Sequence, residues 1–125
     1  MKIQESAEDY LENILILSQE KGNVRSIDIV NKMNFSKPSV SVAMKRLREK
    51  GQIKVDENGY ITLTDSGREI AEHIYERHLF LSEMLRKLGV DVESATEEAC
   101  HIEHDISQDT FEKLKTWVEG TGLLD

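Results

Sequence analysis

The sequence predicts a mainly α-helical protein with one small β-hairpin: an N-terminal winged helix-turn-helix followed by a helical second half. Two short helical patterns, at residues 27–33 and 37–50, are separated by a tight joint, as in a helix-turn-helix. Directly after them the apolar period changes from helical to alternating, which is typical of a hairpin wing. Helical periodicity resumes from Ser66 onwards. We therefore expect two domains, residues 1–72 and residues 73–125.

The first expected helix begins at a capping Ser6 and ends at Gly22. Its apolar residues recur on one face, and its other face is acidic. In the helix-turn-helix, Ser26 caps the first helix and Pro38 lies in the first turn of the second, where its missing N–H is not needed. Gly51 ends that second helix. Residues expected to face the core here are Ile27, Ile29, Val30, Met33, Val40, Ala43, Met44 and Leu47.

The hairpin is expected from "QIKV" and "YITL" around "DENG", where Asn58 and Gly59 supply the positive backbone angles of the turn. A capping box of Ser66 with Glu69 starts a long helix that ends at Gly89. Two shorter helices complete the chain, roughly Val92 to Asp105 and Ser107 to Glu119.

The net charge of −8 hides a strong segregation of charge along the chain. Residues 25–54 hold eight basic residues against Asp28 and Glu49, a local net charge of +6. Residues 1–24 carry −3 and residues 55–125 carry −11. A basic segment inside an acidic protein is the electrostatic pattern that phosphate binding requires.

No part of the sequence predicts a membrane or secretory protein. No apolar run approaches the ~20 residues that span a bilayer, and the first residues lack the apolar centre of a signal peptide. Cys100 is the only cysteine, so no internal disulfide is possible. We expect a cytoplasmic protein.

The second helix of a helix-turn-helix lies in the major groove of DNA, so its outward residues are small or polar and are flanked by cations. The alternative is that "KRLREK" is only a solvated helix face, but its place within a complete helix-turn-helix and wing favours DNA binding. Ser36 and Lys37 lie at the leading end of this helix. Candidate base or groove contacts are Ser39, Ser41, Val42 and Arg46, and candidate phosphate contacts are Lys37, Lys45, Arg48 and Lys54.

The stretch "EEACHIEHDI" offers a possible metal site, because residues three and four apart share one face of a helix. Cys100, Glu103 and His104 would place a thiolate, a carboxylate and an imidazole together, which suits a divalent transition metal. "HIEH" is not the His-Glu-x-x-His pattern of a metalloprotease. Further candidate ligands are Asp9, Glu12 and His78. Six mixed donors suffice for one or two octahedral Fe(II) or Mn(II) ions rather than a closed zinc site.

Each candidate ligand also has a simpler explanation. Asp9 suits the first turn of a helix, and Glu12 alone suits a surface. His78 suits a hydrogen-bonded core histidine, and Cys100 suits a small buried apolar residue. Only the coincidence of donors near Cys100 favours a metal. We expect the other two histidines, His73 and His101, to lie on the surface.

Four stretches in order, "SAEDYLENI", "SVSVAMKRLREKG" with its wing, "YERHLFLSEMLRKLGV" and "EEACHIEHDIS", together cover nearly the whole chain. They resemble the diphtheria-toxin-repressor family of metal-dependent transcriptional regulators. The resemblance implies a homodimer that binds palindromic operator DNA when Fe(II) or Mn(II) is loaded, and so represses metal-uptake genes. Longer family members continue into a small barrel domain, so we expect a short, two-domain member here.

Residue by residue, the resemblance implies a mixed ligand set. Asp9 and Glu12 match the first-helix carboxylates of the manganese-responsive branch, whereas Cys100 looks like the cysteine of the iron branch. Ser82 and Thr96 stand where the iron branch has a glutamate and a histidine, which puts an ancillary site in doubt. The thiolate places Fe(II) slightly ahead of Mn(II), with Zn(II) or Co(II) as surrogates. The resemblance assigns the common ligands to His78, Glu103 and His104.

Further expectations concern the assembly and its alternatives. A metal held by ligands of both domains would fix the angle between them, and thus the spacing of two recognition helices in a dimer. One alternative is a winged-helix regulator that senses an organic ligand or is constitutive. A small metal-dependent enzyme is disfavoured, because no nucleophile–base pair or phosphate loop occurs, and we expect no small organic substrate.

Apolar residues expected in the dimer contact, or alternatively in the core, are Leu79, Phe80, Met84, Leu85 and Leu88.

Overall fold

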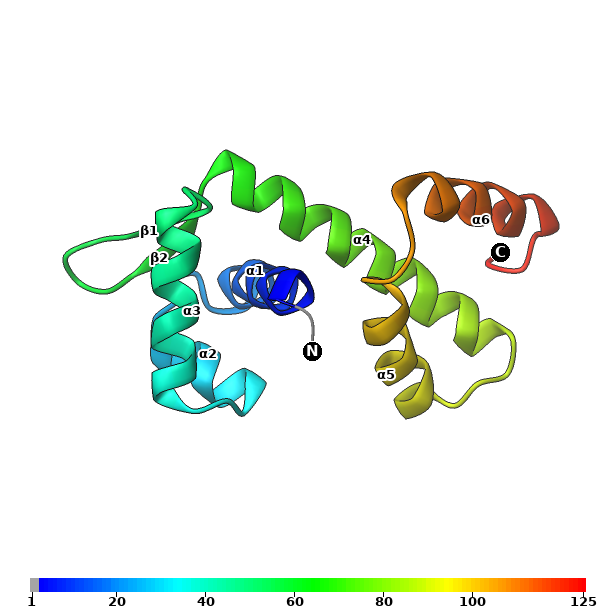
Figure 1. Cartoon of the computed structure of the whole chain (residues 1–125). Helices are drawn as coiled ribbons and strands as arrows, with labels where there is room; N and C mark the ends of the chain where they lie inside the picture. The colour runs from blue at the N-terminus through cyan, green and yellow to red at the C-terminus, as the bar shows by residue number, and fades with distance from the viewer. Residues whose placement is uncertain (1–2) are drawn as a thin grey trace. The chain divides into compact units, whose positions relative to one another are not determined.

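A computed structural model describes residues 3–125, with side chains from residue 6 onwards. The predicted architecture of helices with a single hairpin is confirmed (Figure 1). None of the helices within the described residues combines the length and the apolar character that crossing a membrane requires. The elements are α1 (Ile3–Lys21), α2 (Ser26–Met33), α3 (Lys37–Glu49), β1 (Ile53–Val55), β2 (Ile61–Leu63), α4 (Asp65–Lys87), α5 (Val92–Ile102) and α6 (Gln108–Thr121).

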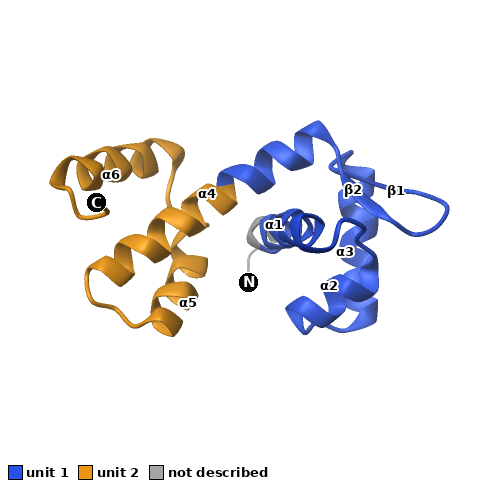
Figure 2. Ribbon diagram, turned by 180° about the vertical axis from the view of Figure 1, so that it is seen from behind, with its two compact units in different colours: residues 1–73 blue, residues 74–125 orange. Residues whose placement is uncertain are grey.

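The chain forms two compact units, residues 1–73 and residues 74–125, and the boundary between them falls inside α4 (Figure 2). The first unit contains α1, α2, α3 and the hairpin, and the second contains α5, α6 and most of α4. Each unit has its own buried apolar residues.

The first unit packs its three helices and its hairpin around one core. The buried apolar residues of α1 recur at helical spacing, as predicted, and those of α3 include Val40, Met44 and Leu47. In α2 the core residue is Ile29, which is fully buried, whereas Ile27 is 45% exposed. The other buried apolar residues of this unit are Tyr10, Leu11, Ile14, Leu15, Leu17, Val24, Ile53, Ile61 and Ala71.

Helix starts in the first unit differ from the predictions at two caps. Ser6 lies inside α1, which begins at Ile3. The N-cap of α2 is Arg25 instead of Ser26, and its backbone N–H donates to the carboxylate of Asp28 at 2.9 Å. The prediction from Ser26 is wrong because the start of α2 is fixed by the Asp28 carboxylate. An acidic residue at N3 can accept the backbone N–H of the N-cap residue.

The cap of α3 is Ser36, whose hydroxyl accepts the N–H of Ser39 at 3.2 Å. Pro38 lies in the first turn, as predicted. Asn34 ends α2 in the left-handed conformation with φ 57°, which asparagine tolerates better than most residues. These caps define the short joint between α2 and α3, so α3 begins at the residue that the sequence predicted.

The wing is a short antiparallel hairpin in which Ile53 pairs with Leu63 and Val55 with Ile61. Its loop is wider than a two-residue turn, and of its described residues Gly59 alone has a positive φ, at 82°. The expectation that Asn58 shares this geometry is wrong, because its N–H instead donates to the Asp56 carboxylate at 2.9 Å. Such a bond is the usual way in which aspartate shapes a turn.

Helix α4 begins at Asp65, and its first turn is capped by Thr64, two residues before the predicted cap Ser66. The Thr64 hydroxyl accepts the N–H of Gly67 at 3.2 Å and donates to the carbonyl of Gly51 at 2.7 Å. A Cβ atom at Gly67 would lie 2.0 Å from the carbonyl oxygen of Gln52. The start of α4 is therefore packed directly on the backbone that leads into the wing.

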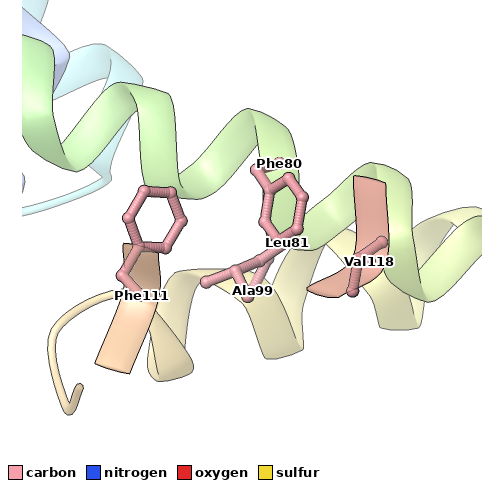
Figure 3. Packing of buried hydrophobic residues seen from close by; sticks show 5 residues of the cluster. All are labelled: Phe80, Leu81, Ala99, Phe111 and Val118. Carbon is pink, nitrogen blue, oxygen red and sulfur yellow. The ribbon is translucent and has the colours of Figure 1, made fainter. Parts of the chain in front are cut away.

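The second unit packs α4, α5 and α6 around an apolar cluster that Figure 3 shows. The rings of Phe80 and Phe111 meet edge to face, with centroids 5.6 Å apart. Asp91 caps α5, and Ser107 caps α6 as predicted. Helix α5 ends at Ile102, three residues before the predicted Asp105. The cluster consists of Phe80, Leu81, Ala99, Phe111 and Val118.

Candidate metal centre and nucleic-acid surface

Three side chains of the second unit bring a nitrogen, a sulfur and an oxygen atom together. His78 lies on α4 and Cys100 lies in the last turn of α5. Glu103 is the C-cap residue of α5. His78 Nδ1 lies 3.7 Å from Cys100 Sγ and 3.3 Å from Glu103 Oε2, and one donor atom from each residue lies within 4.8 Å of the others. Metal–ligand bonds of ~2.0–2.3 Å place neighbouring donors at roughly such separations. The donor set fits a divalent transition metal.

His104 lies beside this cluster, with its Nε2 atom 3.6 Å from Glu103 Oε1. Because α5 ends at Ile102, only Cys100 of the three residues predicted to share one helical face lies within the helix. Glu103 and His104 occupy the turn that follows. The side chain of Glu103 is fully buried, and that of His104 is 1% exposed. A buried carboxylate is stable only with close partners or a cation, and here both histidines approach it.

The electrostatics of the cluster place a proton on His78 when no metal is bound. Hydrogen bonds with Cys100 and then Glu103 raise the pKa of His78 to about 10, while its partial burial acts in the opposite direction. Charge attraction from Glu103 and Cys100 adds to the rise. A protonated imidazole therefore faces the carboxylate, in the place of the positive charge that a cation would supply.

Asp9 and Glu12 both lie on α1, one helical turn apart, in the first unit. Glu12 is buried, with 5% of its surface exposed, and Asp9 is half-buried. The burial of Glu12 argues against the simpler explanation that this residue lies on the surface. A buried carboxylate needs close partners or a cation, so the burial of Glu12 indicates a role beyond solubility.

Ser82 and Thr96, the two positions at which the resemblance put an ancillary site in doubt, each form a hydrogen bond within their own helix. The Ser82 hydroxyl donates to the carbonyl of Leu79 at 3.3 Å, and the Thr96 hydroxyl donates to the carbonyl of Val92 at 2.9 Å. His73 and His101 are exposed, as predicted.

Arg77 is a residue that the sequence pattern does not single out, although it stands directly before His78. Its guanidinium donates to the carbonyl oxygens of Glu103 and Ile106 at 3.0 and 2.7 Å. No periodic pattern connects positions so far apart in the chain, so only the folded structure shows this contact.

The second candidate site is the exposed face of α3, opposite its buried residues. Val42 is 51% exposed and lines two shallow hollows, one on each side of the helix. The hollow of about 330 Å³ includes Lys45 and Arg48, and that of about 410 Å³ includes Ser39 and Arg46. The residues predicted to contact DNA are all exposed: Ser36, Lys37, Ser39, Ser41, Val42, Lys45, Arg46, Arg48 and Lys54.

The apolar residues predicted for the dimer contact divide between surface and core. Leu79 is 50% and Leu88 is 63% exposed, so both lie on the surface of the second unit. Phe80 is 7% exposed and belongs to the core cluster, against which Met84 also packs. Leu85 is half-buried.

Comparisons with known proteins agree with this arrangement. Residues 2–61 match the model of the N-terminal DNA-binding domain of iron-dependent repressors. Residues 64–120 match the model of the metal-binding and dimerisation domain of the same repressors.

Among curated relatives, an uncharacterised HTH-type transcriptional regulator of Methanocaldococcus jannaschii is 33% identical, over 94% of this chain and 95% of its own. The transcriptional regulator MntR of Salmonella typhimurium is 32% identical, over 95% of this chain and 76% of its own.

Solved structures include the manganese regulator SloR, with a TM-score of 0.80 and 29% identity over 90% of this chain. The structure of T. acidophilum IdeR has a TM-score of 0.75 and 30% identity over 92% of this chain. The chain spans about half of each of these two structures, 53% in both cases. The resemblance on which the sequence predictions drew is thus confirmed, and the chain belongs to the iron-dependent repressor family of metal-dependent, DNA-binding transcriptional regulators.

Proposed function

We propose that this protein is a repressor that binds operator DNA as a homodimer when Fe(II) or Mn(II) is bound, and so controls metal-uptake genes. The observation that carries the proposal is the cluster of His78, Cys100 and Glu103, in a chain whose α3 presents a basic and exposed face. Its presence in the cytoplasm follows from its proposed partner, DNA.

We assign the metal ligands to His78, Cys100, Glu103 and His104, with Asp9 and Glu12 as further predicted ligands. A bound cation would supply positive charge to the carboxylate of Glu103, which is buried. The chain has to release the proton of His78 and present Cys100 as a thiolate, because both donors bind metal only when deprotonated. A metal held by residues of both domains, 1–72 and 73–125, would then favour one relative arrangement of two recognition helices.

The donor types favour different ions at different ligands. A thiolate ligand suits Fe(II) better than Mn(II), whereas the carboxylates Asp9 and Glu12 suit Mn(II). We place Fe(II) first, with Zn(II) and Co(II) as surrogates. Structures of the related ScaR carry bound Zn²⁺ and Cd²⁺, which supports a site that accepts several divalent ions.

For DNA, we assign base or groove contacts to the exposed residues of α3 and phosphate contacts to the cations around them. Ser36, at the N-cap of α3, lies at the leading end of this surface. The exposed Leu79 and Leu88 remain the surface residues proposed for the dimer contact. The proposed base contacts are Ser39, Ser41, Val42 and Arg46, and the proposed phosphate contacts are Lys37, Lys45, Arg48 and Lys54.

Titration of DNA binding with anaerobic Fe(II) and with Mn(II) tests this function. The DNA is a pool of duplexes selected from random sequences with the metal-loaded protein. We expect tight binding with either ion and loss of binding after a chelator. DNA binding that a chelator leaves unchanged would instead favour a winged-helix regulator that metal does not control.

A Glu103→Gln variant sharpens the test, since it keeps the shape of the buried side chain and removes its charge. We expect it to lose the metal response while its helical circular dichroism stays unchanged. An unaltered metal response would refute the assignment of Glu103 as a ligand.

A further inference from the structure

Arg77 connects α4 to the turn between α5 and α6 through three hydrogen bonds. Its Nη1 donates to the carbonyl oxygens of Glu103 and Ile106, at 3.0 and 2.7 Å. Its Nη2 donates to the side-chain oxygen of Gln108 at 2.9 Å. The guanidinium carbon also lies 5.5 Å from the centre of the Phe111 ring, within the range of a cation–π contact. One side chain thus holds both ends of this turn.

The turn needs such a partner because α5 has already ended at Ile102. Carbonyl groups beyond a helix C-terminus lack partners within the helix and have to find them elsewhere. The planar guanidinium presents several donors in a fixed geometry, so it can hold two carbonyls and an amide at once. The backbone of Glu103 is therefore tied to the residue that directly precedes His78.

We propose that Arg77 is a positioning residue of the metal centre: by holding the turn of residues 103–108 on α4, it places Glu103 and His104 at the distance from His78 that a shared ion requires. The proposal rests on the metal function proposed above. Partners of this kind, which orient ligands without touching the metal, typically account for 10–100-fold in metal affinity.

The positive charge of Arg77 alone predicts the opposite effect on metal affinity. Arg77 is a cation, so its removal would strengthen the binding of a divalent cation if electrostatic repulsion were its main contribution. Loss of positioning would weaken binding. The sign of the change in affinity therefore separates the two roles.

A neighbouring pair supplies a matched control. Lys115 on α6 donates to the carboxylate of Glu76 on α4 at 3.0 Å. This bond also joins α4 to α6, and Glu76 directly precedes Arg77 in the chain. It does not contact the turn of residues 103–108 among the interactions described. Lys115→Ala removes one cation and one contact between α4 and α6 but leaves the turn in place.

The test measures Mn(II) affinity of the full chain by electron paramagnetic resonance of the free ion, with circular dichroism and thermal melting of each metal-free variant. We expect Arg77→Ala to weaken Mn(II) binding by about 10–100-fold. Arg77→Lys should recover only part of this loss, because an ammonium group cannot reproduce the planar set of donors. Lys115→Ala should leave the affinity within about twofold.

Co(II) provides a second measurement, because a charge-transfer absorption band reports its bond to the thiolate of Cys100. We expect this band to persist in Lys115→Ala, and to shift or weaken in Arg77→Ala as the turn moves. If Arg77→Ala does not fold, Arg77→Lys and Gln108→Ala carry the same comparison, each with a smaller expected loss. Gln108→Ala removes the acceptor of Nη2 and leaves the two carbonyl acceptors of Nη1 in place, although it also removes the bond that the Gln108 amide donates to Glu112 at 3.2 Å.

Unchanged or tighter Mn(II) binding by the folded Arg77 variants would overturn the positioning role and leave the metal function standing. An equal loss in Lys115→Ala would also overturn it, because general loosening of α4 against α6 would then explain the result. Failure of the unchanged protein to bind Mn(II), Fe(II) or Co(II) would overturn the metal function itself, and the role of Arg77 with it.

Discussion

His104 and His101 stand three residues apart in the chain but in opposite environments. The side chain of His104 is almost fully buried beside Glu103, whereas His101 is exposed on α5. Proximity to Cys100 in the sequence does not separate them, since His101 is its direct neighbour. Their difference makes them a natural pair for testing the ligand assignment.

We expect His104→Ala to weaken Mn(II) binding by more than the ~100-fold that loss of an orienting partner costs. His101→Ala should leave affinity unchanged, because its exposed side chain contributes no proposed ligand. Isothermal titration calorimetry of the two variants measures this difference. Equal affinities would remove His104 from the ligand set.

Arg46 lies on the exposed face of α3, where it lines one of the two hollows beside Val42. If it reads a base edge, Arg46→Ala should weaken binding to selected DNA by about 1–3 kcal/mol and relax the preference at one base position. Mn(II) affinity should not change. Lys45→Ala, as a phosphate contact, should weaken binding to all sequences alike. Binding assays on a panel of single-base variants distinguish the two patterns.

At the scale of elements, the joint between the wing and α4 depends on Gly67. An added methyl group there would lie 2.0 Å from the Gln52 carbonyl oxygen, so the backbone would have to move. We expect Gly67→Ala to destabilise the protein by about 1–3 kcal/mol, the usual effect of overpacking. Gly120→Ala is the control, since nothing lies within 4 Å of that position in α6. It should stabilise by up to ~1 kcal/mol, and urea unfolding measures both changes.

Helix α2 offers an element whose stability depends on pH. Hydrogen bonds from Lys21 and from the backbone of Arg25 hold the pKa of Asp28 below its ordinary value. Because the folded-state pKa is the lower one, Asp28 stabilises the fold at pH values above its unfolded pKa, and this contribution is lost as pH falls through the folded pKa.

We expect Asp28→Asn to reduce the free energy of unfolding by about 0.5–1 kcal/mol at neutral pH. The difference from the unchanged protein should persist to about pH 5 and narrow below about pH 4, near the ordinary aspartate pKa. Urea unfolding at a series of pH values measures it. A difference that grows as the pH falls would contradict this account of the α2 start.

At the scale of the whole molecule, binding to a polyanion by a protein of net charge −8 requires its cations to be gathered on one surface. Four cations of each chain are proposed phosphate contacts, so a dimer would neutralise about eight phosphates. We therefore expect the logarithm of DNA affinity to fall against the logarithm of salt concentration with a slope of about −7. A slope of about half that value would indicate that only one chain engages the DNA. Fluorescence anisotropy at several salt concentrations measures it.

Short-range patterns explain why so much of the fold was predictable. Apolar spacing located every helix, and glycine, proline and serine marked most of their ends, because these signals act within a few residues. Several errors lie where a cap came from another residue type, as with Thr64 and Arg25, or where a helix ended early, as with α5 at Ile102. Another lies in the wing turn, where the Asp56 carboxylate accepts the N–H of Asn58.

The sequence by itself determined the helix-turn-helix with its wing, the basic exposed face of α3, and the residue types that suit a divalent metal. Only the tertiary structure decided which of those residues meet. His78 reaches Cys100 and Glu103 because the apolar cluster of α4, α5 and α6 packs these helices together. Arg77 finds the carbonyl of Glu103 through the same packing. Such contacts depend on burial across distant segments, which local periodicity does not encode.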